Sequence, residues 1–165
     1  MGEKAAVDAT DTPRTRASMT ADLRALGVAE SGVLLVHSSL SSLGWVCGGA
    51  VAVVGALLDV LAPEGTLVVP THTTGNSDPA TWTNPPIPQS WWATVREHMP
   101  AFDPLLTPST GVGAVPELVR TWPGAMRSDH PQMSFAAVRP ARRADHRWPR
   151  LEERDGRGLP ARAPV

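Results

Sequence analysis

Two aliphatic runs on either side of an apolar helical pattern constrain the fold more than any other feature of the chain. The runs are Val33–Val36 and Thr66–Pro70, and continuous aliphatic runs of this length are typical of fully buried strands. Between them, residues 49–61 carry valines and leucines at helical spacing, and Pro63-Glu-Gly65 ends the pattern. Strand, helix and strand in this order predict a βαβ unit. We therefore expect an α/β fold with a parallel-type sheet covered by helices.

A turn rich in serine joins the first predicted strand to the helix. It reads His37-Ser-Ser-Leu-Ser-Ser-Leu-Gly44. Backbone N–H groups are unbonded at a helix start and the helix dipole favours negative charge there, so such a turn suits a phosphate-bearing ligand. The serines also suit simple turn or capping roles, and His37 suits a structural role at the end of a strand.

Local patterns predict the remaining elements. A helix over 18–27 stops at Gly27, and a strand is expected over 133–138. A second turn of small residues, 105–113, opens a helix that runs through Glu117 to Trp122. The other predictions are a long proline-rich loop over 71–88 and a short helix over 90–99.

Composition limits the class of protein. The 165 residues suit one domain, and the net charge of −1 gives no electrostatic reason to expect a nucleic acid or a membrane as partner. A single cysteine, Cys47, excludes an internal disulfide and suits a reducing compartment. The first residues lack the pattern of a signal peptide, and no apolar run is long enough to span a membrane. We expect a cytoplasmic protein in which residues 1–13 are disordered.

Other reactive side chains indicate no further site. Cys47 has no evident partner and is expected to be a small buried hydrophobe. The histidines His72, His98 and His146 do not have metal-ligand spacing, so no metal is expected.

Seven stretches of sequence, taken together and in this order, resemble one known family over residues 18–138. They are Leu35-Val-His-Ser-Ser-Leu-Ser-Ser-Leu-Gly44, Pro63-Glu-Gly-Thr-Leu-Val-Val-Pro-Thr71, Trp82-Thr-Asn-Pro-Pro86, Phe102-Asp-Pro104, Thr107-Pro-Ser-Thr-Gly-Val-Gly-Ala114, Glu117-Leu-Val-Arg-Thr-Trp-Pro-Gly124 and Arg127-Ser-Asp-His-Pro-Gln-Met-Ser-Phe-Ala-Ala137. The chain resembles the aminoglycoside 3-N-acetyltransferases, also called antibiotic N-acetyltransferases. This resemblance implies transfer of an acetyl group from acetyl-CoA to the 3-amino group of the deoxystreptamine ring of an aminoglycoside antibiotic, which inactivates the antibiotic.

The resemblance also implies roles for particular residues. Glu117 and His130 become catalytic candidates, because a protonated amine must lose a proton before it attacks the thioester, and Asp129 could orient His130. A dipole-stabilising role for Glu117 and a loop-capping role for His130 remain open. The predicted acetyl-CoA cradle and its second wall consist of His37, Ser38, Ser39, Leu40, Ser41, Gly44, Thr110 and Gly111.

The resemblance ends after Val138. Residues 14–138 correspond to the N-terminal part of the acetyltransferase domain, whereas 139–165 is an Arg/Pro/Ala-rich segment that holds eight of the fifteen basic residues. The family's later segment with its principal catalytic histidine is not matched. We therefore expect a truncated relative with a disordered tail, and a frameshift near codons 139–147 is our hypothesis for its origin. A tail that binds RNA through charge is the alternative.

Two other functions compete with this one. A catalytically inactive, CoA-binding fragment remains open, because the serine turn alone permits binding. A dinucleotide-binding dehydrogenase is excluded, since Gly44-x-x-x-Gly48-Gly49 is not the glycine fingerprint of that class.

Overall fold

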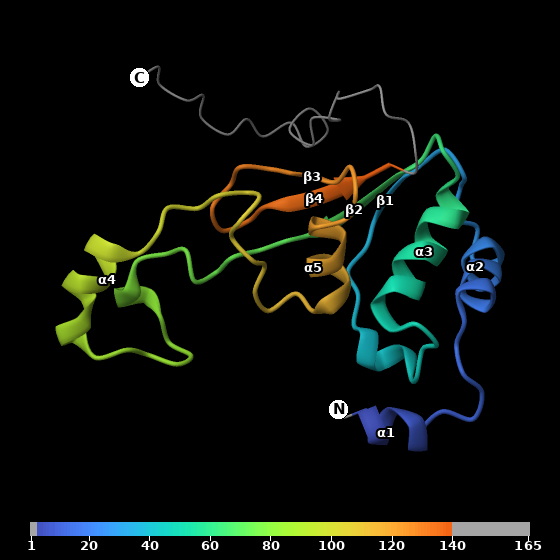
Figure 1. The fold of residues 1–165 in the computed structure, drawn as a ribbon, viewed down its shortest axis with the longest axis horizontal. Coiled ribbons are helices and arrows are strands. Elements are labelled where there is room, and N and C mark those ends of the chain that lie inside the picture. The colour runs from blue at the N-terminus through green and yellow to red at the C-terminus, as the bar shows by residue number, and fades with distance from the viewer. Residues whose placement is uncertain (1–2, 140–165) are drawn as a thin grey trace.

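The computed structural model describes residues 3–139 as a layer of helices on a small sheet (Figure 1). The predicted disordered tail, residues 139–165, lies outside the described residues from position 140 onward. The helices are α1 (Glu3–Asp8), α2 (Arg16–Ala25), α3 (Gly49–Leu61), α4 (Trp92–His98) and α5 (Ala114–Arg120). Short 3₁₀ turns are η1 (Leu40–Leu43), η2 (Pro79–Thr81) and η3 (Gln89–Trp91). The strands are β1 (Val33–Leu35), β2 (Thr66–Pro70), β3 (Met126–Arg127) and β4 (Phe135–Val138).

The sheet is mixed, with strand order β1-β2-β4-β3. β1 and β2 are parallel, with Val33 opposite Thr66, and α3 connects them, so the predicted βαβ unit is confirmed. β4 runs antiparallel to both β2 and β3. The sheet therefore adds two antiparallel pairs to the parallel pair that the sequence predicted.

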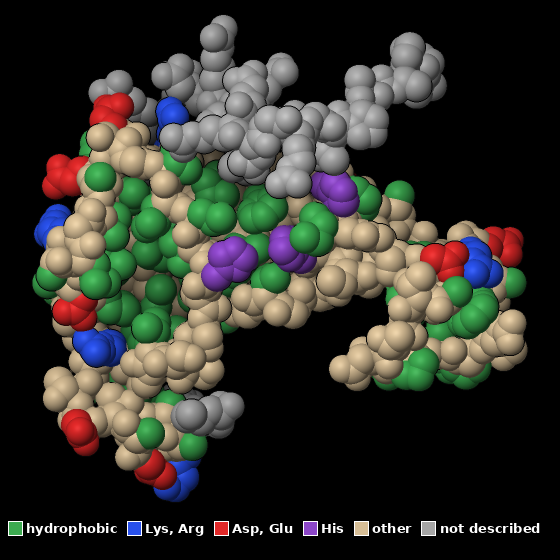
Figure 2. All heavy atoms as spheres, turned by 180° about the vertical axis from the view of Figure 1, so that it is seen from behind, with side chains coloured by type: hydrophobic (Ala, Val, Ile, Leu, Met, Phe, Trp, Pro, Cys, Tyr) green, Lys and Arg blue, Asp and Glu red, His purple; other side chains and the backbone are tan. Residues whose placement is uncertain are grey.

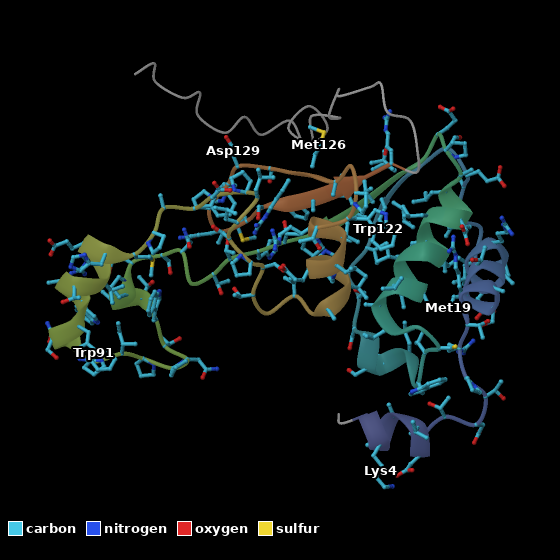
Figure 3. All side chains as sticks on the ribbon, viewed as in Figure 1. Lys4, Met19, Trp91, Trp122, Met126 and Asp129 are labelled. Atoms are coloured by element: carbon cyan, nitrogen blue, oxygen red, sulfur yellow. The ribbon has the colours of Figure 1, made fainter. Side chains whose placement is uncertain are left out.

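Helix α3 forms the centre of the core. Its sequence is almost entirely apolar because it is buried on most sides: it packs on α2 and α5 and contacts β2. Val54, Val60 and Leu61 are fully buried, and burial of each such side chain contributes about 1.5–3 kcal/mol. Figure 3 shows Met19 between α2 and α3 and Trp122 near α5, both packed in or against this core.

One glycine sets the connection from α3 to β2. A Cβ atom on Gly65 would lie 2.5 Å from the carbonyl oxygen of Leu61 and 2.7 Å from that of Glu30. Both contacts are with backbone, which cannot move aside cheaply. Gly65 therefore allows the backbone before β2 to lie against the last turn of α3 and against the segment that leads into β1.

Three local expectations were wrong. β1 is not fully buried: Val33 is 48% and Leu35 52% exposed, since β1 is an edge strand with only one face on the core. Residues 3–8 are helical rather than disordered, because Lys4 and Asp8 form an i,i+4 ion pair at 2.5 Å and α1 is followed by anchoring bonds at Thr10. Cys47 is exposed, because it precedes α3 in a surface turn.

A segment around α4 projects from the sheet (Figure 1). The packing partners of α4 are the neighbouring turns η2 and η3, and α4 has no buried residue. An ion pair between Arg96 and Asp78 at 2.9 Å joins α4 to the start of η2 within this segment. Trp91, at its tip in Figure 3, is 57% exposed.

Within residues 3–139, no helix combines the length and the apolar character that a membrane span needs.

Candidate functional site

The carboxyl ends of β1 and β2 meet at one edge of the sheet, and we call the surface there the strand-end site. His37 and Ser38 follow β1, and Thr71 and His72 follow β2. Since parallel strands end side by side, residues far apart in sequence gather here, as in other open α/β sheets that bind ligands at this edge.

The second turn of small residues lies against the same edge. The N–H of Thr110 donates to the carbonyl oxygen of His72 at 2.8 Å. A Cβ atom built on Gly113 would lie 3.9 Å from the carbonyl oxygen of Ser38. The second turn therefore lies beside the carboxyl ends of both strands, with Thr110 bonded to His72 and Gly113 near Ser38, although about 70 residues separate it from the serine turn in the sequence.

Two buried polar atoms at the strand-end site have no hydrogen-bond partner: Oγ of Ser38 and Nε2 of His72. Burial, together with the nearby His37, lowers the pKa of His72, so its ring is neutral at pH 7. The ring of His72 packs edge-on against Phe135, with centroids 5.4 Å apart. Figure 2 shows histidine side chains gathered beside hydrophobic ones on this face of the molecule. Because buried polar atoms are nearly always hydrogen-bonded, these two atoms are candidate contacts for water or a ligand.

The serine turn itself forms the 3₁₀ turn η1, with Ser39 at its N-cap position. The hydroxyl groups of Ser39 and Ser41 lie 3.1 Å apart, and the hydroxyl of Ser42 donates to that of Ser39 at 3.0 Å. These hydroxyls are exposed, whereas Leu40 packs against the hydrophobic core. The turn therefore presents hydroxyl groups to solvent and is anchored by an apolar side chain.

Gly44 has a packing role in this structure. Its φ of +75° is left-handed, and a Cβ atom there would lie 2.6 Å from Oγ1 of Thr10. The same Oγ1 accepts the N–H of Trp45 at 2.8 Å. Helix α3 begins at Gly49, as the apolar pattern over 49–61 predicted, and residues 45–48 separate it from the serine turn.

Glu117 lies in the first turn of α5 and is held on both carboxylate oxygens. Oε2 accepts the N–H and the hydroxyl of Ser109 at 2.8 and 2.6 Å, and Nη2 of Arg120 donates to Oε1 at 2.5 Å. Burial raises the pKa of Glu117, but the bonds from Arg120 and Ser109 outweigh burial and lower this pKa to about 2. Glu117 is therefore ionised at neutral pH and already saturated with donors.

His130 is exposed in the loop between β3 and β4. Its Nδ1 accepts the N–H groups of Gln132 at 3.2 Å and of Met133 at 3.0 Å. In the neutral ring the proton therefore resides on Nε2. This geometry is that of a loop-capping histidine.

Arg127 was not singled out by its sequence, yet it ties together three segments beside the site. Nη2 donates to the carbonyl oxygen of Thr71 at 2.6 Å, Nε donates to the Ser134 hydroxyl at 3.0 Å, and Nη1 donates to the carbonyl oxygen of Thr107. The guanidinium also lies 4.9 Å from the centre of the Phe102 ring. Burial and the nearby Arg120 lower the pKa of Arg127. Sequence patterns give little indication of this role, because Arg127 bonds to Thr71, which lies 56 positions earlier in the chain.

A comparison with known protein families decides where the chain belongs. The family of aminoglycoside 3-N-acetyltransferases matches residues 35–145, about two thirds of the chain. The chain belongs to this family. The match continues past Val138, so the resemblance extends further than the sequence stretches alone indicated.

Individual acetyltransferases of the family agree with this assignment. The aminoglycoside N(3')-acetyltransferase-like protein YokD of Bacillus subtilis is 52% identical over 81% of the chain and 50% of its own length. Its crystal structure superposes with a TM-score of 0.81, covering 83% of the chain and 51% of YokD at 51% identity. Aminoglycoside N(3)-acetyltransferase VII of Streptomyces paromomycinus is 40% identical over 90% of the chain and 52% of its length.

A third related acetyltransferase, AAC-IIIb in a binary complex with CoASH, matches with a TM-score of 0.65 at 32% identity. This match covers 78% of the chain and 47% of AAC-IIIb. The chain thus spans about half the length of the acetyltransferases that it matches.

Within residues 3–139, no group of three or more His, Cys, Asp or Glu side chains has the geometry to hold a metal ion. Of the predicted site residues, the serine turn and the Thr110–Gly111 turn share the strand-end site. Glu117 is linked to that turn through Ser109, and His130 caps the loop before β4.

Proposed function

We propose that this chain supplies the acetyl-CoA side of an aminoglycoside 3-N-acetyltransferase. The observation that carries the proposal is the position of the turn of residues 110–113 at the carboxyl ends of two parallel strands, where Thr110 bonds to His72 and Gly113 lies near Ser38 of the serine turn. The family assignment supports acyl transfer, and the CoASH complex of AAC-IIIb supports CoA as the acyl carrier. Because the chain has one cysteine and suits a reducing compartment, we place the reaction in the cytoplasm.

The cofactor side uses groups that the structure leaves available. The exposed hydroxyls of Ser39 and Ser41 and the imidazole of His37 suit the polar parts of CoA, and Ser38 and Thr110 line the same edge. Gly111, with φ of +73° and open space around its Cα, lets backbone approach a ligand closely. Leu40 and Gly44 act indirectly, since they fix the turn to the core and to Thr10.

In the reaction, the 3-amino nitrogen attacks the thioester carbonyl carbon. A C–N bond forms, the C–S bond breaks, the amine loses a proton and CoA leaves with its sulfur protonated. A pKa of about 2 makes Glu117 a poor acceptor for that proton, and its carboxylate is already paired with Arg120, so we assign it an orienting role through its bonds to Ser109. His130 can donate from Nε2 while its Nδ1 caps the loop.

The second function, a catalytically inactive CoA-binding fragment, is favoured by this saturation of Glu117, because Ser109 and Arg120 occupy its carboxylate oxygens and its low pKa makes it a poor proton acceptor. Both functions require CoA binding, but only the transferase acetylates an aminoglycoside.

Calorimetric titration with CoA, followed by an acetylation assay with acetyl-CoA and gentamicin, tests both. We expect Ser38→Ala to weaken CoA binding and the exposed control Ser31→Ala to leave it unchanged. Binding with acetylation supports the transferase, and binding without acetylation supports the inactive fragment. A folded chain that binds no CoA overturns both.

A further inference from the structure

His72 is a half-buried histidine that follows β2 within the strand-end site. Its surroundings hold it in place from two sides. Its carbonyl oxygen accepts the N–H of Thr110 at 2.8 Å, and its ring packs edge-on against Phe135. The residue before it, Thr71, is fixed as well, because its N–H donates to the carbonyl oxygen of Ser134 at 2.8 Å. The imidazole ring therefore has a defined direction at the strand ends.

The two ring nitrogens of His72 have different surroundings. Within residues 3–139 neither nitrogen has a hydrogen-bond partner, and only Nε2 is shielded from solvent. Nδ1 therefore reaches the surface of the site. Native structures leave a buried N–H without an acceptor less often than a buried acceptor without a donor. In the neutral ring we accordingly place the proton on Nδ1 and the lone pair on the buried Nε2.

The ring of His72 is uncharged at pH 7, since burial and the nearby His37 both lower its pKa. Protonation adds a second N–H, on Nε2, where the described part of the chain offers no acceptor, and burying such a group is costly. His72 thus presents a neutral N–H donor at the strand ends. A neutral donor also avoids the repulsion that a charged ring would exert on a polycationic aminoglycoside.

We propose that Nδ1–H of His72 donates a hydrogen bond to the carbonyl oxygen of the acetyl thioester and stabilises the negative charge that develops there. This inference rests on the proposed acetyl-CoA site. When the amine nitrogen attacks, a C–N bond forms and the π pair of the carbonyl moves onto oxygen. The pair returns as the C–S bond breaks, the proton lost by the amine ends on the CoA sulfur, and His72 keeps its own proton throughout. One such donor contributes about 100- to 1,000-fold to the rate of acyl transfer.

The same tautomer excludes His72 as the base that takes the proton from the amine. Its lone pair lies on Nε2, which is buried in the folded chain and so is out of reach of an amine in the site. A hydrogen-bond donor and a base at this position therefore differ in the location of one proton, which can be measured.

The first test locates this proton in the full 165-residue chain without any ligand, by ¹⁵N-edited NMR of the histidine rings. We expect the Nδ1–H tautomer for His72, whose signals are identified by their loss in His72→Phe. His98, with 68% of its side chain exposed, provides the reference for a ring in solvent. An Nε2–H tautomer for His72 overturns the proposal.

The second test measures the contact with the thioester by binding alone. His72→Phe removes the donor and keeps an aromatic ring against Phe135. It should weaken the binding of acetyl-CoA roughly three- to tenfold in calorimetric titrations and leave the binding of CoA unchanged. The infrared carbonyl band of ¹³C-labelled acetyl-CoA should lie at lower wavenumber on wild type than on His72→Phe. His72→Gln, which restores an N–H donor, should recover part of both effects.

The matched control is His98→Phe on α4, which should bind both compounds as wild type does. Circular dichroism shows whether each variant is folded. Equal binding of acetyl-CoA by wild type and His72→Phe, with an unchanged carbonyl band, overturns this inference and leaves the CoA site standing. Equal weakening of CoA and acetyl-CoA overturns it in favour of a structural role for His72. A folded wild-type chain that binds neither compound rejects the proposed function, and this inference with it.

Discussion

At the scale of single residues, two arginines organise the walls of the strand-end site. Arg120 holds Glu117 and the carbonyl oxygen of Leu105, and Arg127 holds Thr71, Ser134 and the turn after Pro104. The planar guanidinium supplies several donors in fixed directions, which is why arginine rather than lysine suits both positions. Both side chains donate to backbone carbonyl oxygens of the turn of residues 104–110 and so hold it in place.

Replacement of Glu117 should change the acid stability of the protein. Folding lowers the pKa of Glu117 from 4.5 to about 2, so its contribution to stability is complete above pH 4.5 and is lost as the pH falls toward 2. Glu117→Gln should cost about 1–2 kcal/mol at pH 7, because Arg120 loses its charge partner. Urea unfolding at several pH values measures both effects.

The informative comparison is the slope of the unfolding free energy between pH 4.5 and pH 2. Glu117→Gln should have a shallower slope than wild type in this range. Asp22→Asn, at an exposed ion pair with Arg14, is the control and should resemble wild type. Equal slopes for Glu117→Gln and wild type would contradict the ion pair.

Replacement of Arg127 by lysine should be costly although the charge is kept. Lysine cannot bond Thr71, Ser134 and Thr107 together, so we expect a loss of about 2–3 kcal/mol in unfolding free energy. Arg24→Lys on the exposed face of α2 is the control and should change stability by less than about 0.5 kcal/mol. Thermal unfolding of both variants gives the comparison, and a stable Arg127→Lys protein would show that these bonds are dispensable.

At the scale of elements, the junction between α3 and β2 depends on close approach of backbone. Gly65→Ala should destabilise the protein by about 2–3 kcal/mol, because its Cβ would meet the carbonyl oxygens of Leu61 and Glu30. Gly75→Ala is the matched control, since a Cβ atom there meets nothing within 4 Å. Denaturant midpoints of the two variants should differ clearly, and similar midpoints would show that the junction adjusts without cost.

Two short helices of equal length should differ in local stability. α4 and α5 each contain seven residues, but α4 buries none of them, whereas α5 buries Val115, Pro116 and Val119. Helices this short are marginal without tertiary packing. We expect amides of α4 to exchange with solvent about 100-fold faster than those of α5, as measured by hydrogen exchange. Equal protection would mean that α4 packs more firmly than its contacts indicate.

Hydrophobic spacing predicted the elements well where a local pattern decides them. The bounds of α3 and β2 agree with the sequence patterns over 49–61 and Thr66–Pro70, since both elements are almost entirely apolar and the segment Pro63-Glu-Gly65 separates them. β3 was missed because two residues carry no periodicity. The exposure of Val33 and Leu35 was missed because an aliphatic run indicates a buried strand but does not show whether the strand lies at the centre or at the edge of the sheet.

At the scale of the whole molecule, the sequence indicated which segments meet at the strand ends but not the bonds that hold them there. The family resemblance assigned the serine turn and the Thr110–Gly111 turn to one acetyl-CoA site, which stays a prediction, while the structure places Thr110 against His72 and Gly113 near Ser38. The hydrogen bonds that saturate Glu117 depend on Ser109 and Arg120, which sequence patterns do not rank above other polar residues. The contacts of Arg127 join segments up to 56 residues apart, so only the fold reveals them.

Oγ of Ser38 and Nε2 of His72 are buried at the strand-end site without a hydrogen-bond partner. A ligand that bonds to either atom binds the folded chain and not the unfolded one, so it also stabilises the fold by mass action. Occupancy of the site and the stability of the whole molecule are therefore coupled, and the melting temperature should rise with the concentration of CoA.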